Sequence, residues 1–173
     1  NKAVHYLGRY TSSRHKLAQI LQRFATRKLT DYDSQDIRAA LEHTLEQCAK
    51  LGYIDDWQFA VTKARSQRRL GRSQAVIRQR LRQHALDDDT IMQALAEADE
   101  GSIDGDLQAA IRFARRRRLG PFANRASALH LRHDPQQWRR RDLGAMARAG
   151  FSIATSRKII EHDDSDTIDE LLE

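Results

Sequence analysis

One helix is marked at both of its ends in residues 51–71, LGYIDDWQFAVTKARSQRRLG. Asp55 is a favourable N-cap residue, and Gln58 stands three positions later, so the two residues can form a capping box. Gly71 follows the last position of the helical pattern, and glycine there is a typical left-handed terminator. These signals predict a helix that begins after Asp55 and ends before Gly71.

Apolar residues recur at helical spacing on both sides of this segment. The run RRLG occurs twice, at 68–71 and at 117–120. The expected helices fall into three sets of three, which indicates a repeat architecture. Two of the sets share the same spacing after a serine cap: Ser13, Leu17 and Leu21 in one, Ser73, Ile77 and Leu81 in the other.

Three short helices bury little apolar surface by themselves, so neighbouring units must stack. We therefore predict an all-α fold, a tandem array of three three-helix repeats that is elongated and curved. A single compact helical bundle is the alternative that periodicity leaves open. The expected boundaries are 1–52 for repeat 1, 53–99 for repeat 2, 104–162 for repeat 3 with an inserted loop, and 163–173 for an acidic C-terminal tail.

The chain is basic, with 30 Lys and Arg residues against 24 Asp and Glu residues, and its net charge is +6. Most of the basic residues are arginine, whose planar guanidinium group pairs with phosphate or carboxylate through two hydrogen bonds. This composition favours a polyanionic partner, such as nucleic acid or an acidic protein groove. A basic surface that only keeps the protein in solution explains the same charge.

Several function classes lack their residues in this sequence. Neither a Walker-type phosphate loop nor a dinucleotide-binding glycine fingerprint is present, so we expect no enzyme and no cofactor. Cys48 is the single cysteine, which excludes an intrachain disulfide and suits a reducing compartment. His130 and His133 have a metal-like spacing without a third ligand, so we expect no metal site. No apolar run is long enough to span a membrane, and we expect a cytoplasmic protein.

Aromatic residues are few, and we interpret most of them as packing residues. Tyr53 and Phe59 are expected in the core. Trp57 and Trp138 are expected to pack in the core or at a helix start. The alternative for the two tryptophans is an exposed platform on which bases stack.

The run LGYIDDWQFA at residues 51–60 resembles the RecX family, which are bacterial regulators of the RecA recombinase. The resemblance covers most of the chain, and it implies three tandem three-helix repeats. It also implies binding to the groove of the RecA filament on single-stranded DNA, inhibition of ATP hydrolysis and strand exchange, and filament disassembly. Further matching segments are Arg65, RRLG at 68–71, IRQRL at 77–81 and LGAMARAGFS at 143–152.

Arginines gather around the end of the helix predicted in repeat 2. No acidic residue lies between Arg65 and Leu86, so the clustered guanidinium groups repel one another unless an anion neutralises them. Arg78 and Arg82 add further charge. The main group follows the i, i+3, i+4, i+7 pattern of one helical face: Arg65, Arg68, Arg69 and Arg72.

Repeat 3 has a similar group, with no acidic residue between positions 107 and 133. Its members are Arg112, Arg115 and Arg116, and Arg139 and Arg140 follow at a helix start, where the helix dipole disfavours positive charge. We predict that both groups bind the filament or DNA. The alternative is a solvated face whose side-chain stems cover the core.

The resemblance to the RecX family implies a negative regulator of homologous recombination in DNA repair, with the RecA filament on single-stranded DNA as its partner, and we expect it to be a monomer. A helical repeat module that binds nucleic acid directly is one alternative, since three-helix units with short turns are similar to helix-turn-helix domains. A scaffold without a nucleic-acid role is the other. We expect the acidic tail to screen or orient the basic body.

Overall fold

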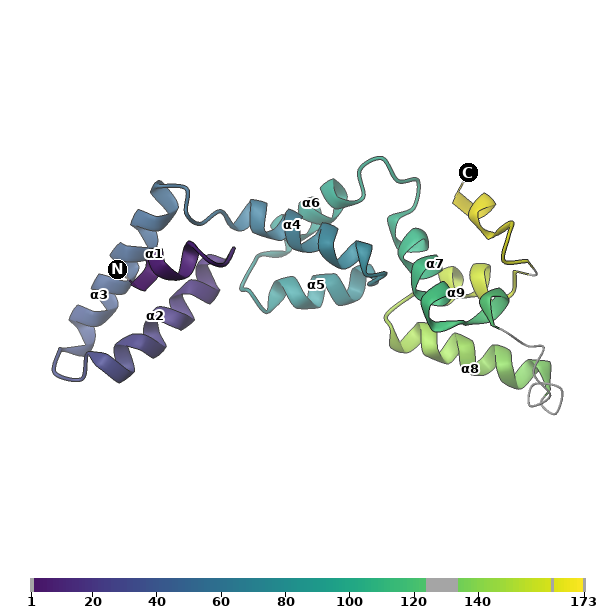
Figure 1. Ribbon diagram of the computed structural model, residues 1–173, viewed down its shortest axis with the longest axis horizontal. Helices are drawn as coiled ribbons and strands as arrows, with labels where there is room; N and C mark the ends of the chain where they lie inside the picture. The colour runs from purple at the N-terminus through teal and green to yellow at the C-terminus, as the bar shows by residue number, and fades with distance from the viewer. Residues whose placement is uncertain (1, 124–133, 163, 173) are drawn as a thin grey trace.

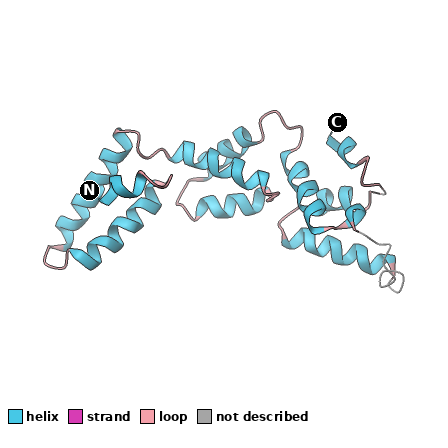
Figure 2. Cartoon of the chain, viewed as in Figure 1, coloured by secondary structure: helices cyan, strands magenta, loops and turns pink. Residues whose placement is uncertain are grey.

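The computed structural model describes residues 2–123, 134–162 and 164–172, and over them the chain is helical without a strand (Figure 2). The helices form three consecutive units. The first unit consists of α1 (Lys2–Leu7), α2 (Arg14–Lys28) and α3 (Ser34–Lys50). The second unit consists of α4 (Asp56–Arg69), α5 (Gln74–Arg82) and α6 (Asp88–Ala98). The third unit consists of α7 (Gly105–Arg117), α8 (Pro135–Arg148) and α9 (Ile153–Ile160), with the short 3₁₀ helices η1 (Gly120–Phe122) and η3 (Ile168–Leu172).

Each unit has an apolar core of its own. The first core contains Leu17, the second contains Ile77 and Ile91, and the third contains Met146 and Ile159, all fully buried. The cores are separate, and the three units lie in line, so the molecule is elongated (Figure 1). The prediction of an all-α tandem array is confirmed, and a single compact bundle is excluded. The units form a shallow arch, and the middle helices α2, α5 and α8 lie along its lower edge in Figure 1.

The ends of the helices follow local signals. Asp55 is the N-cap of α4, and its carboxylate accepts the backbone N–H of Gln58 at 2.9 Å. Gly71 has a φ of +64° and ends the same helix, as predicted. Ser13 and Ser73 are the N-caps of α2 and α5, which confirms that these two helices occupy equivalent places in their units.

Successive units are linked by the same backbone contact. Asp56, in the first turn of α4, accepts the N–H of Arg14, the first residue of α2, at 2.8 Å. Asp106, in the first turn of α7, accepts the N–H of Gln74, the first residue of α5, at 2.6 Å. The second and third units therefore each supply a carboxylate to the start of the middle helix in the preceding unit. Between the second and third units, Ser73 also donates from its hydroxyl group to the carbonyl of residue 149 at 2.7 Å.

Two segments differ from the expectations. Ile168 is fully buried in the third core, so η3 packs as part of the third unit. The described acidic residues of this segment, Asp164, Asp166 and Glu170, are exposed. Tyr53 is 54% exposed and is not a core residue, because its neighbour Ile54 takes the inward position in the same turn. Ile54 belongs to the first core, although the expected boundary places it in repeat 2.

Candidate functional site

Arg68 lies inside the protein, at the joint between the second and third units, and is only 5% exposed. Its Nε and Nη2 atoms donate to the two carboxylate oxygens of Asp99 at 2.8 and 2.7 Å, and Nη1 donates to Oδ1 of Asp106 at 2.7 Å. Burial lowers the pKa of Arg68, but the hydrogen bonds to Asp99 and Asp106 outweigh it, and the pKa is raised. Arg68 therefore stays charged and connects α4 with the end of α6 and the start of α7.

The structure changes the interpretation of the first arginine group. No acidic residue is near Arg68 in the sequence, but its partners come from positions 31 and 38 residues further along the chain. Arg65 and Arg82 also have acidic partners, Glu97 and Asp88, each at 2.8 Å. These two pairs are exposed, and exposed pairs add little stability. Arg65 and Arg82 thus remain accessible to a partner, whereas Arg68 does not.

Two arginines of α7 contact the end of α4. Arg116 donates from Nη1 to the carbonyl of Leu70 at 2.7 Å, and Arg112 donates to the carbonyl of Arg68 at 3.4 Å. The C-terminal carbonyls of a helix carry partial negative charge, which favours guanidinium groups there. Gly71 permits the close approach, because a Cβ at this position would lie 3.0 Å from two backbone atoms of α7. Part of the second arginine group is therefore used to pack two units together.

Some of the predicted arginines line one hollow at the joint between the second and third units, and the other predicted arginines lie away from this hollow. A hollow of about 310 Å³ beside the connector between α6 and α7 is also lined by Asp99 and Glu100, so its charge is mixed. The predicted residues on α5 and α8 lie on other elements. The predicted residues that line this hollow are Arg65, Arg68, Arg69 and Arg112.

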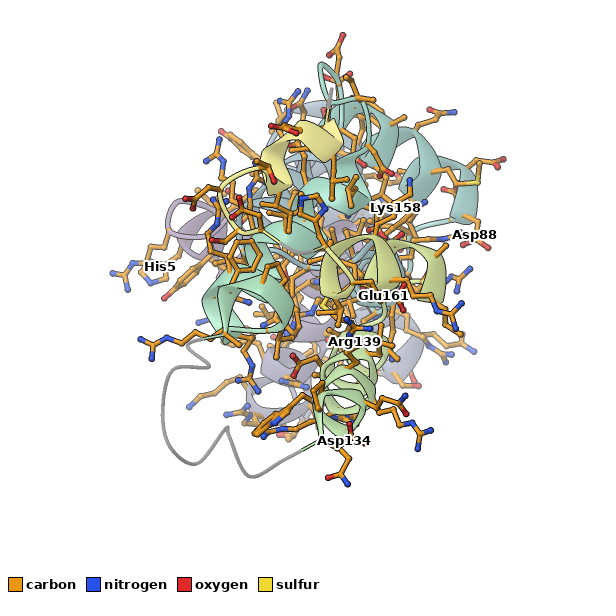
Figure 3. The ribbon with its side chains drawn as sticks, turned by 90° about the vertical axis from the view of Figure 1, so that its right-hand side faces the viewer. His5, Asp88, Asp134, Arg139, Lys158 and Glu161 are labelled. Atoms are coloured by element: carbon orange, nitrogen blue, oxygen red, sulfur yellow. The ribbon has the colours of Figure 1, made fainter. Side chains whose placement is uncertain are left out.

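The remaining predicted residues are at or near the surface. In the end-on view of Figure 3, Arg139 on α8 lies close to Glu161 at the end of α9. Both side chains line a hollow of about 170 Å³, so an acidic group also accompanies Arg139. The guanidinium group of Arg115 lies over the ring of Phe122, 5.1 Å from its centre. Arg115, Arg139 and Arg140 are exposed, and Arg72 and Arg78 are half-buried.

A basic feature that we did not predict runs along the middle helices. The sequences of α2 and α5 contain no Asp or Glu residue. The sequence of α8 contains one, Asp142, which is buried and accepts the N–H of Gly120 at 2.9 Å. Counting the acidic residues of each predicted helix would have revealed this pattern. We call α2, α5 and α8 the basic edge, and its exposed cations include Arg23, Arg27 and Lys28 on α2, Arg82 on α5, and Arg140 and Arg148 on α8.

Both tryptophans are half-buried. Trp57 is half-buried against the second core, as predicted. Trp138 is half-buried, and the guanidinium group of Arg141 lies over its ring at 5.1 Å from the centre. Because a cation occupies one face of this ring, stacking of a base on that face requires Arg141 to move.

Other reactive side chains give no sign of chemistry in the described part of the chain. Cys48 is 5% exposed, and burial raises the pKa of its thiol, which disfavours the nucleophilic thiolate. Among the described residues, no group of histidine, cysteine and acidic side chains is arranged to hold a metal ion. No helix of this part has the length and apolar character to cross a membrane. His130 and His133 lie outside the described residues.

Comparison with known proteins gives matches along most of the chain. A family profile described as RecX, second three-helix domain, matches residues 55–95. The Regulatory protein RecX of Myxococcus xanthus is 32% identical over 163 residues, which cover 93% of this chain and 83% of that protein. The Regulatory protein RecX of Agrobacterium fabrum is 27% identical over 161 residues, which cover 92% of this chain and 80% of that protein. A crystal structure of regulatory protein RecX has a TM-score of 0.67 at 17% identity and covers 92% of this chain and 68% of that chain, which shows the same fold.

Proposed function

Because the chain belongs to the RecX family of non-enzymatic regulatory proteins, we propose that it binds the RecA filament on single-stranded DNA and restrains it. The basic edge is the observation that carries this proposal. A nucleoprotein filament presents a long path of negative charge, which attracts a matching row of cations. Three units in line, each with a middle helix free of exposed acid, match such a path better than one pocket does.

The proposed mechanism is occupancy. An elongated body that follows the filament contacts more than one RecA subunit and keeps incoming duplex DNA out of the groove, which inhibits strand exchange. Contact with neighbouring subunits interferes with their cooperation, which inhibits ATP hydrolysis and favours disassembly. Each weak contact is strengthened by the other units, because the linked units raise one another's effective concentration.

Charge reversal on the basic edge tests the proposal. The edge variant combines one change in each unit: Arg23→Glu, Arg82→Glu and Arg140→Glu. The matched control makes the same change in net charge on other helices: Arg38→Glu, Lys50→Glu and Arg117→Glu. All six residues are exposed, so both variants should fold, which circular dichroism checks.

The two variants are compared by co-sedimentation with preassembled RecA filaments and by inhibition of RecA ATP hydrolysis. We expect binding by the edge variant to weaken by about a hundredfold, since each reversed contact costs about 1 kcal/mol near an anionic surface. Binding by the control should change by less than about threefold. A folded edge variant that sediments like the parent would show that the filament is bound elsewhere.

Direct binding to nucleic acid is the second candidate function, because the basic edge suits a bare phosphate backbone as well as a coated one. Retention on bare single-stranded DNA and on RecA-coated DNA at physiological salt separates the two. Stronger retention on the coated DNA supports the filament proposal, and equal retention supports the direct module. We further propose that the protein acts as a monomer in the bacterial cytoplasm.

A further inference from the structure

A hollow of about 480 Å³ lies on the second unit, beside its joint with the first, and no acidic side chain lines it. Lys63 projects from α4, and the other lining residues belong to α5 and the turn that follows it. Ammonium, guanidinium, imidazole and amide groups therefore face one space, and all of them donate hydrogen bonds. The lining residues are Lys63, Val76, Gln79, Arg80, Gln83 and His84.

His84 has a defined orientation in this hollow. Its Nδ1 atom lies 3.1 Å from Oγ of Ser13, and its ring packs edge-on against Phe59 with centroids 4.7 Å apart. Oγ of Ser13 already accepts the N–H of Lys16 as the cap of α2, so its own proton is available to Nδ1. In that arrangement Nε2 carries the ring proton and is a donor on the opposite side of the ring from Ser13.

The charges that face His84 from the packed elements are mainly positive. Burial lowers the pKa of His84 most, and Lys63 on α4 and Lys16 and His15 on α2 lower it further. Asp56 on α4 raises the pKa, and its effect is smaller than that of each of these three groups. The fold thus collects positive charge around this imidazole with little compensation from carboxylates.

We propose that this hollow binds a phosphate group, which Lys63, Arg80 and His84 contact together. Arg80 is already oriented, because its Nη1 atom donates to the side-chain oxygen of Gln67. Phosphate oxygens accept several hydrogen bonds from charged donors at once and would neutralise the collected charge. Both a phosphodiester of nucleic acid and a free phosphate compound have this chemistry. The inference goes beyond filament binding, since it concerns the chain alone.

The test is a titration of the full chain that is monitored through the imidazole C–H signals of His84 in nuclear magnetic resonance spectra. The probes are inorganic phosphate and a short single-stranded oligothymidylate, at constant ionic strength kept by chloride. His84→Gln identifies the signals. We expect a saturable shift that is stronger at pH 6 than at pH 8, because an anion favours the protonated imidazole. A shift with the oligonucleotide identifies a phosphodiester as the source, and a shift with inorganic phosphate alone identifies a small phosphate compound.

Variants of the two cationic side chains show whether the shift reports this hollow. Lys63→Gln and Arg80→Gln should each weaken binding by about tenfold, because each removes a hydrogen bond from a charged donor. Lys158→Gln, an exposed change on α9, is the matched control and should leave binding unchanged. Circular dichroism confirms that the variants fold. Absence of a saturable His84 shift with both probes, or equal affinity in the parent and in both hollow variants, overturns the proposal.

Discussion

Arg68→Ala is expected to destabilise the joint between the second and third units. The change removes three hydrogen bonds to Asp99 and Asp106 and a fourth, at 3.2 Å, to the carbonyl of Arg72. Loss of one partner from a buried ion pair costs about 3–5 kcal/mol. The side chains of Asp99 and Asp106 are 25% and 24% exposed, so water replaces part of what they lose. We therefore expect a loss of about 2–4 kcal/mol in the free energy of unfolding.

Urea unfolding followed by circular dichroism measures this loss. Arg69→Ala is the matched control, because Arg69 is the exposed neighbour on the same helix, and its cost should stay within about 0.5 kcal/mol. An array of units need not unfold in one step, so hydrogen exchange locates the effect. Amides of α6 and α7 should exchange faster in Arg68→Ala, while those of α2 and α3 should not change. If the two variants unfold at the same urea concentration, the ion pairs of Arg68 do not stabilise the joint.

Three further predictions concern pH, backbone conformation and the acidic segment. The parent should lose stability as the pH falls through about 6.5, the unfolded pKa of histidine, because the folded pKa of His84 is lower and the unfolded chain binds more protons. Urea midpoints between pH 7.5 and 5.5 should therefore decline less steeply in His84→Gln than in the parent. Gly71→Ala should lower the free energy of unfolding, measured in urea, by about 2–3 kcal/mol, and Gly52→Ala should lower it by only about 1 kcal/mol. Both glycines have positive φ, but only Gly71 lies against another helix. Equal losses in the two variants would contradict tight packing of Gly71 against α7. Neutralising the acidic segment should alter association with the filament more at low salt than at high salt. The segment should stay packed in these variants, because Ile168 is kept. Equal effects on association at both salt concentrations would exclude an electrostatic role. The changes are Asp164→Asn, Asp166→Asn and Glu170→Gln.

Local signals in the sequence predicted the elements well. Asp55, Ser73 and Gly71 act within a few residues of the helix end that they define, so their effect needs no knowledge of the rest of the fold. Because the same spacing of apolar residues follows Ser13 and Ser73, the tandem architecture was also predictable from the sequence. Burial of Ile168 was not predictable in the same way, because η3 packs against α7, whose residues lie far back along the chain.

The candidate site was harder to predict, because pairing of charges depends on contacts between distant segments. The absence of acidic neighbours suggested that Arg68 was free, but Asp99 and Asp106 reach it across the joint. Arginine clustering did not predict the basic character of α2, because the cations of this helix are spread along its length. The absence of acids from a whole helix includes α2, since this pattern does not depend on which basic side chains are adjacent.

The carboxylates that cap the middle helices give the array a direction. Asp56 completes the start of α2 and Asp106 completes the start of α5, so each of the first two units receives this carboxylate from its successor. The last unit supplies its own carboxylate, since Asp134 accepts the N–H of Gln136 at 2.9 Å in α8. During synthesis, the first N–H of α2 and that of α5 therefore gain their carboxylate partners only after the start of the following unit has been made. Fragments that lack the first unit should accordingly be more stable than fragments that lack the third.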